Sequence, residues 1–146
     1  MSTDNFNANH FLDLSKEIED SITNGRDIKR LNKSALIRSA ISRAYYSTFL
    51  SLRESILKNQ QWKVAIKEGK DDHERLRLTL FSLPALGFRP IANDFNNLRK
   101  RRNNADYDLP PTFNAEISHV TRSNLEANKI IQNIPLLTNY LSTHYP

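Results

Sequence analysis

Four consecutive cations dominate the segment of this sequence that is richest in chemically useful side chains. Residues 98–108 read Leu-Arg-Lys-Arg-Arg-Asn-Asn-Ala-Asp-Tyr-Asp, so basic groups are followed by amides, carboxylates and a phenol. Arginine forks bind phosphate, while amides and an aromatic ring can contact a base. Arg102 and Asp106 are four residues apart and can pair on one helix face. The segment predicts either a phosphate- and base-binding patch or an exposed ion pair on a helix end that unwinds toward Pro110.

Adjacent tyrosines mark a second segment, residues 39–49. Successive residues of a helix point about 100° apart, so Tyr45 and Tyr46 cannot face the same way. We expect one ring to pack inside and the other to reach a groove or an interface. The alternative is that both are core aromatics with hydroxyl groups at the rim. Arg43 precedes Tyr46 by about one turn and could share its polar face.

Support for metal or nucleophilic chemistry is weak. The chain has no cysteine, and its three glycines exclude a glycine-rich phosphate loop. The four histidines are scattered, and none has a second histidine or a carboxylate four residues on. The acids around His73 (Asp71, Asp72 and Glu74) fit helix capping better than metal binding. No serine is flanked by glycine as in a hydrolase elbow. We therefore predict no metal site and no cofactor.

Length and charge narrow the remaining possibilities. The 146 residues suffice for one domain, so we expect a single helical domain over residues 1–146 with its core at about residues 6–142. The formal net charge is +5, with basic side chains concentrated in residues 26–43 and 89–102. Two such blocks indicate an anionic partner or, equally, solvated helix faces. No apolar run could span a bilayer and no basic-then-apolar start follows Met1, which predicts a cytoplasmic protein with no membrane partner.

Amphipathic stretches must position these side chains. Over residues 6–23, apolar residues recur at three- and four-residue steps, which predicts a helix. Its expected buried side chains are Phe11, Leu14, Ile18 and Ile22. The strongest stretch covers residues 34–58, contains no Gly or Pro, and has Ser34 where an N-cap is expected. This stretch should form the central helix of the core.

Three more helices are expected after residue 70. Asp71 or Asp72 should cap a short helix, and Pro90 should open the next one, where its missing N–H matters least. The last helix should begin near Thr112 and bend or break at Pro135. The expected buried side chains are Leu76, Leu80, Ile91, Phe95, Leu98, Ile117, Val120, Leu125, Ile130 and Ile131. No alternating run predicts a strand, so the fold class is all-α, an antiparallel bundle of four to five helices.

Three motifs together resemble a known superfamily. They are a Ser-x-Ala-Tyr-Tyr segment at residues 42–46, an Asp-His-Glu helix start at residues 72–74 and an Arg-x-x-Ala-Asp-Tyr segment at residues 102–107. In this order they look like a HEPN (higher eukaryotes and prokaryotes nucleotide-binding) domain of the small prokaryotic branch. The resemblance covers about residues 10–142. It implies an antiparallel helical bundle that dimerises with its motif helices facing each other. Many members are metal-independent endoribonucleases that act as toxins or in phage defence, and several are encoded beside a nucleotidyltransferase antitoxin.

The resemblance also implies roles for individual residues. In the family, an Arg and a His separated by four to six residues form a composite site from two subunits, where the RNA 2′-hydroxyl attacks the neighbouring phosphate. Here the window after Arg102 holds Tyr107, Asp108 and Leu109, and no histidine. The catalytic candidates are therefore Arg102 for the phosphate, with Tyr107 and His73 for proton movement. The candidate nucleotide- or RNA-binding residues are Arg43, Tyr46, Arg99, Arg101, Asn103 and Asp106.

Two hypotheses follow. The first is an RNA-cleaving toxin or defence effector that works as a homodimer. The second is a non-catalytic HEPN module that binds nucleotide, RNA or a partner nucleotidyltransferase, and the missing histidine favours it. In that case Arg102 and Asp106 form a structural pair that orders the helix end, and Tyr107 contacts a ligand or a partner.

Overall fold

A computed structural model describes residues 7–25, 32–58, 68–84 and 86–144. Its α-helices are α1 (Asn9–Thr23), α2 (Lys33–Leu52), α3 (Asp72–Ser82), α4 (Arg89–Tyr107) and α5 (Ile117–His144). A π-helical turn, η1 (Arg53–Leu57), extends α2, and a 3₁₀ turn, η3 (Leu86–Phe88), precedes α4. The basic side chains of the first charge block at positions 26, 29 and 30 lie outside these residues.

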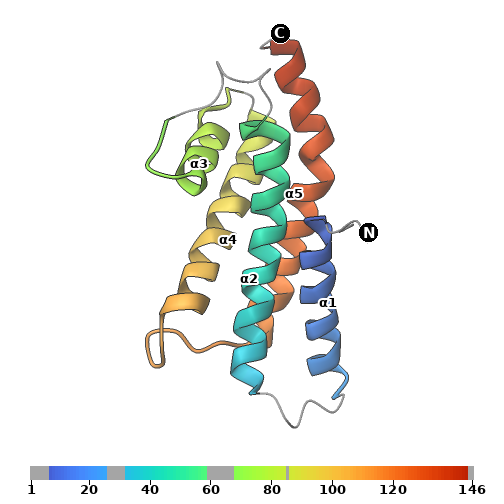
Figure 1. Cartoon of the computed structure of the whole chain (residues 1–146), viewed down its shortest axis with the longest axis vertical. Coiled ribbons are helices and arrows are strands. Elements are labelled where there is room, and N and C mark those ends of the chain that lie inside the picture. The colour runs from blue at the N-terminus through green and yellow to red at the C-terminus, as the bar shows by residue number, and fades with distance from the viewer. Residues whose placement is uncertain (1–6, 26–31, 59–67, 85, 145–146) are drawn as a thin grey trace, which may run out of the picture.

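Four long helices form an antiparallel bundle (Figure 1). Helices α1, α2, α4 and α5 run alternately in opposite directions, and α2 packs against each of the other three. Helix α3 lies beside one end of the bundle, where it contacts α4 and η1. Because the described residues contain helices and no strand, the prediction of an all-α helical bundle is confirmed. None of the helices in this part of the chain has both the length and the apolar character of a membrane span.

The core is built around α2. Ala40 and Ala44 have no exposed surface, and their small side chains allow the neighbouring helices to approach closely. Tyr45 and Phe95 are the largest fully buried side chains, and their ring centroids lie 5.7 Å apart across the α2–α4 contact. Full burial of a side chain such as Phe95 contributes roughly 1.5–3 kcal/mol to folding. The predicted burial of Phe95 and Leu98 is confirmed.

Two leucines of the predicted buried stripes are exposed. Leu14 is 47% exposed and Leu125 is 58% exposed, so both predictions are wrong. In α1 the buried residues are instead Leu12 and Ser15, and the Ser15 hydroxyl donates a 2.7 Å hydrogen bond to the backbone carbonyl of Ala40. Three- and four-residue spacings allow more than one buried face. A serine becomes buried where a partner satisfies its hydroxyl, which hydropathy alone does not reveal.

The predicted starts of α3 and α4 are correct, whereas the predicted start of α2 lies slightly too far along the chain. Asp71 caps α3, and its carboxylate accepts a 2.8 Å hydrogen bond from the backbone N–H of Glu74. Pro90 lies in the first turn of α4, as predicted. Helix α2 begins before the predicted Ser34, because the side chain of Asn32 accepts a hydrogen bond from the backbone N–H three residues on.

Helix α5 begins at Ile117 rather than near the predicted Thr112. The preceding residues 112–116 are not helical. In this connection Phe113 is only 8% exposed and packs in a second core cluster, and its carbonyl accepts a hydrogen bond from Arg38. Tertiary contacts therefore hold this segment out of the helix.

Helix α5 also continues through Pro135 to His144, so a break there is not observed. Proline removes one hydrogen bond from a helix interior and crowds the preceding turn. Leu137 and Leu141 lie beyond the proline and are almost fully buried. Their burial against the bundle offsets the local cost and keeps the last turns helical.

Candidate functional site

The two adjacent tyrosines of α2 differ in burial, and the prediction that one ring packs inside is confirmed. Tyr45 is fully buried and Tyr46 is half-buried, and their rings meet edge to face with centroids 5.5 Å apart. Burial raises the pKa of the Tyr45 hydroxyl far above its ordinary value, so this hydroxyl stays protonated. The two rings form an aromatic platform at the junction of α2, α3 and α4.

Arg102 of α4 lies on this platform and is held by its neighbours. Its Nη2 donates a 2.6 Å hydrogen bond to the hydroxyl of Tyr46, and its Nη1 donates a 2.9 Å hydrogen bond to Asn103 Oδ1. Its Nε lies 2.9 Å from Asp106 Oδ2, which confirms the predicted ion pair. The side chain is 13% exposed, so the guanidinium is fixed in one place before any ligand binds.

The side chain of Arg102 stays protonated and positively charged despite its burial. Burial by itself lowers the pKa of a guanidinium. At Arg102 the neighbouring Tyr46 and Asp106 outweigh burial and raise the pKa. The guanidinium carbon also lies 5.1 Å from the ring centroid of Tyr46 and 5.5 Å from that of Tyr45, which favours the cation. Arg102 is therefore a permanent positive charge set against aromatic faces.

His73 joins the same platform from the first turn of α3. Its Nδ1 lies 2.5 Å from the hydroxyl of Tyr45, and its ring stacks on Phe49 with centroids 3.9 Å apart. Burial, and after it the positive charge of Arg102, lower the pKa of His73. The imidazole is therefore neutral at neutral pH. The structure brings His73 and Arg102 to adjacent tyrosines without placing them in direct contact.

Arg43 and Arg99 flank the platform. The guanidinium carbon of Arg43 lies 5.7 Å from the ring centroid of Tyr46 and 4.8 Å from that of Phe11 on α1. The positive charge of Arg99 contributes, more weakly than burial and Arg102, to the lowered pKa of His73. Both arginines are half-buried. They extend the positive character of the site along α2 and toward α3.

Arg101 lies apart from this cluster. Its guanidinium donates a 2.9 Å hydrogen bond to Glu126 and a 3.0 Å hydrogen bond to Ser123, both on α5. The two charged side chains are only 12% and 10% exposed, so they form an interior ion pair. Successive helix residues diverge by about 100°, which directs Arg101 toward α5 and Arg102 toward α2. The structure therefore does not unite these two predicted binding residues.

Three predicted residues occupy the C-terminal end of α4. Tyr107 is 72% exposed, and its ring centroid lies 5.7 Å from the guanidinium carbon of Arg102. Asn103 and Asp106 orient Arg102 through the contacts given above. Both side chains therefore act first on the arginine, whereas the phenol of Tyr107 projects to the surface.

The predicted site residues left out two side chains that shape the site. Phe49 supports the ring of His73, and Tyr45 supplies the hydroxyl that His73 contacts. The spacing of Tyr45 and Phe49, four residues apart on one helix, could have indicated that they share a face. Their contact with His73 joins residues more than twenty positions apart, and no local pattern predicts that pairing.

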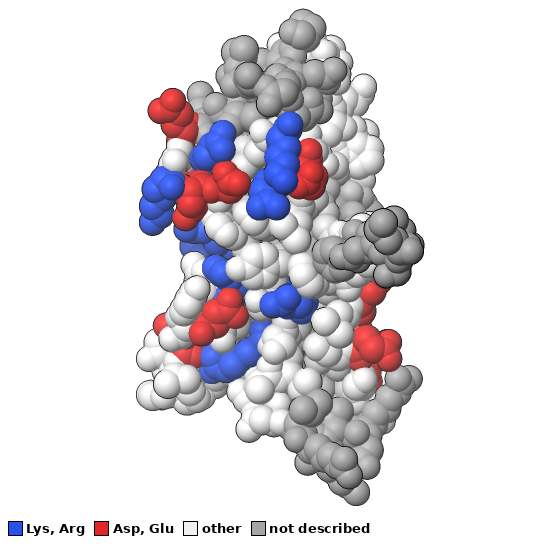
Figure 2. All heavy atoms as spheres, viewed as in Figure 1, with Lys and Arg blue, Asp and Glu red and all other residues white. Residues whose placement is uncertain are grey.

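The face that carries the site is mixed in charge. Figure 2 shows Lys and Arg side chains interleaved with Asp and Glu side chains over α2, α3 and α4. Helix α3 contributes Asp71, Asp72 and Glu74 at its start, and Asp106 lies against Arg102. A ligand at this site would therefore be selected by the local geometry at Arg102 rather than by a uniformly positive surface.

The described residues contain no group of three or more His, Cys, Asp or Glu side chains that could hold a metal ion. The sequence matches no family model, no curated protein and no solved structure. The HEPN resemblance therefore rests on the three motifs and stays a prediction.

Proposed function

We propose that this chain is a HEPN-type RNA-binding protein that cleaves RNA without a metal ion at the Arg102–His73 platform. The observation that carries this proposal is the pairing of a fixed guanidinium with a neutral imidazole on two adjacent tyrosines. A phosphodiester needs a cation beside its phosphate and a group that takes a proton from the 2′-hydroxyl. Both kinds of group occur here on one rigid support.

Arg102 would bind the phosphate. Each Nη carries two N–H groups and uses only one within the chain, so one N–H on each remains for a phosphate oxygen. His73 would accept the proton of the 2′-hydroxyl at Nε2 while its Nδ1–H donates to Tyr45. The 2′-oxygen then bonds to phosphorus, the bond to the 5′-oxygen breaks, and the phenol of Tyr107 gives its proton to that oxygen. The products are a 2′,3′-cyclic phosphate and a free 5′-hydroxyl.

The proposal includes a homodimer. Tyr107 and Leu109, at the end of α4, are 72% and 75% exposed, which leaves an apolar rim next to the Arg102 platform. A second copy packed on this rim would exclude water from the platform and bring a second Arg102 close to the same RNA. Sedimentation at micromolar concentration tests this part, and a strict monomer would refute the composite site.

A second candidate is a non-catalytic module that binds nucleotide, RNA or a partner nucleotidyltransferase. It is favoured by the close engagement of Arg102 with Tyr46, Asn103 and Asp106, which is typical of a structural arginine. In this case a toxin–antitoxin or phage-defence role would depend on binding alone. A nucleotidyltransferase gene beside this one would support such a partner under either chemistry.

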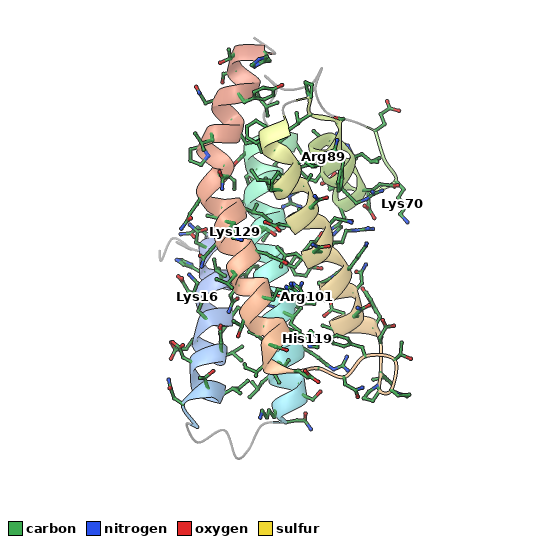
Figure 3. All side chains as sticks on the ribbon, turned by 180° about the vertical axis from the view of Figure 1, so that it is seen from behind. Lys16, Lys70, Arg89, Arg101, His119 and Lys129 are labelled. Carbon is green, nitrogen blue, oxygen red and sulfur yellow. The ribbon has the colours of Figure 1, made fainter. Side chains whose placement is uncertain are left out.

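Cleavage of a fluorescent single-stranded RNA in the presence of EDTA distinguishes the candidates. We expect Arg102→Ala to lower cleavage by at least about 100-fold, and His73→Gln to lower it by about 10²–10⁴-fold while RNA binding persists. Arg89→Ala is the matched control, because Arg89 is exposed at the opposite end of α4 (Figure 3).

Each outcome decides between the two candidates. Cleavage that survives Arg102→Ala undiminished would refute the site. Binding without cleavage, weakened in Arg102→Ala but not in Arg89→Ala, would establish the non-catalytic module instead. Neither binding nor cleavage in the wild-type protein would reject both.

A further inference from the structure

A separate hollow lies between α4, α5 and the segment that connects them. It has a volume of about 470 Å³, within the range of small-molecule sites, and all of its lining residues belong to the described part of the chain. Arg101 and His119 line it and are labelled in Figure 3, which shows the molecule from the side opposite to Figure 1. Its residues are distinct from those of the Arg102 platform.

The charge of the hollow is predominantly positive. Lys100, Arg101 and Arg122 line it together with a single carboxylate, that of Glu126. The interior ion pair with Arg101 already occupies Glu126. Arg122 is 74% exposed and lies 3.9 Å from Glu126, and Lys100 is exposed with no ion pair to any described residue. Two exposed cations therefore remain for an anion from outside.

A ring and two amides complete the lining. His119, in the first turn of α5, is half-buried against Phe113, with ring centroids 5.0 Å apart. The backbone N–H of Glu116 donates a 3.0 Å hydrogen bond to His119 Nδ1, which fixes the orientation of the imidazole. Asn97 and Asn104 are exposed on α4 and offer both donors and acceptors.

We propose that this hollow binds a mononucleotide. The phosphate would lie between Lys100 and Arg122, and the base would stack on the imidazole of His119. The amides of Asn97 and Asn104 would contact the edge of the base. The ion pair between Arg101 and Glu126 would form the base of the hollow, and it would keep the single carboxylate away from the phosphate. This site does not depend on the function proposed for the Arg102 platform.

Calorimetric titration of the full chain with adenosine and guanosine 5′-monophosphates tests the proposal, with adenosine and inorganic phosphate as partial ligands. We expect each nucleotide to bind more tightly than either part. Lys100→Ala and Arg122→Ala should each weaken binding by about fivefold or more, because each removes one charge-assisted contact to the phosphate. Arg101 is left intact in these variants, since its loss would strand the buried Glu126.

Two controls separate this site from the rest of the surface. Lys129→Ala removes a cation two turns beyond Arg122 on α5, outside the hollow, and should leave the affinity unchanged (Figure 3). Arg102→Ala reports any nucleotide that binds at the platform instead, since a loss of affinity in this variant that Lys100→Ala does not share belongs to the platform. Inorganic phosphate that binds as tightly as the nucleotides would overturn the ligand class. No binding at millimolar nucleotide, or binding lost in Arg102→Ala but not in Lys100→Ala, would overturn the site.

Discussion

Replacing Arg38 with alanine should loosen the end of α4 that carries the candidate site. Arg38 projects from α2, and its guanidinium donates to the backbone carbonyls of Ala105, Asp108 and Phe113 at 2.9, 2.6 and 3.0 Å. The same group lies 5.3 Å from the ring centroid of Phe113. One side chain therefore satisfies the last carbonyls of α4 and ties the connection before α5 to α2.

The expected loss of stability follows from these contacts. Each hydrogen bond from a charged donor contributes about 1.5–3 kcal/mol to stability. Water can reach these half-buried carbonyls after the substitution, so the three bonds together should contribute ~3 kcal/mol. In a chain of this length that corresponds to a fall in Tm of about 6–12 °C. Urea unfolding followed by circular dichroism measures the change directly.

Two comparisons make the Arg38 experiment decisive. Lys33→Ala removes an exposed cation from the first turn of the same helix, and we expect less than about 0.5 kcal/mol there. Arg38→Lys keeps the charge but loses the fork that reaches several carbonyls, so its stability should fall between the wild type and Arg38→Ala. An Arg38→Ala protein as stable as Lys33→Ala would show that these carbonyls need no internal donor.

The remaining predictions concern His73 and the interior ion pair between Arg101 and Glu126. The folded-state pKa of His73 lies below its unfolded value near 6.5, so the unfolded chain binds the proton more readily. The free energy of unfolding should therefore fall as the pH drops from about 7 toward 5. Urea titrations at these two pH values should show a smaller fall for His73→Gln than for the wild type. An equal slope in both proteins would contradict this assignment. Arg101→Ala should lower the free energy of unfolding by about 3–5 kcal/mol, because it leaves the buried carboxylate of Glu126 without its ion-pair partner. Arg101→Met combined with Glu126→Met should recover most of this loss, as measured by thermal unfolding. A double variant no more stable than Arg101→Ala would show that the unpaired charge of Glu126 does not cause the loss of stability.

Features governed by neighbours in sequence were predictable. The Asp71 cap, the position of Pro90 and the pairing of Arg102 with Asp106 depend on groups within four residues of each other. The different orientations of Tyr45 and Tyr46, about 100° apart around the helix axis, follow from helical geometry alone. These predictions hold because the helix fixes the relative positions of such groups wherever it packs.

Features that depend on packing were predicted less well. Leu14 and Leu125 match an apolar spacing and are nevertheless exposed. The start of α5 was placed too early, because Phe113 packs in the core and Arg38 holds its carbonyl outside the helix. Pro135 sits within a continuous helix because buried leucines follow it. In each case the competing contact comes from a distant part of the chain.

The amino-acid sequence by itself determined the helical class, the arginine-rich segment of α4 and the different orientations of the two tyrosines of α2. The tertiary structure decided that His73 meets Tyr45 and that Arg101 turns away to Glu126. These pairs are 28 and 25 residues apart, so only the packing of whole helices sets the distance between them. Helix periodicity fixes the face on which a side chain lies, and the burial of apolar surface between helices fixes what that face meets.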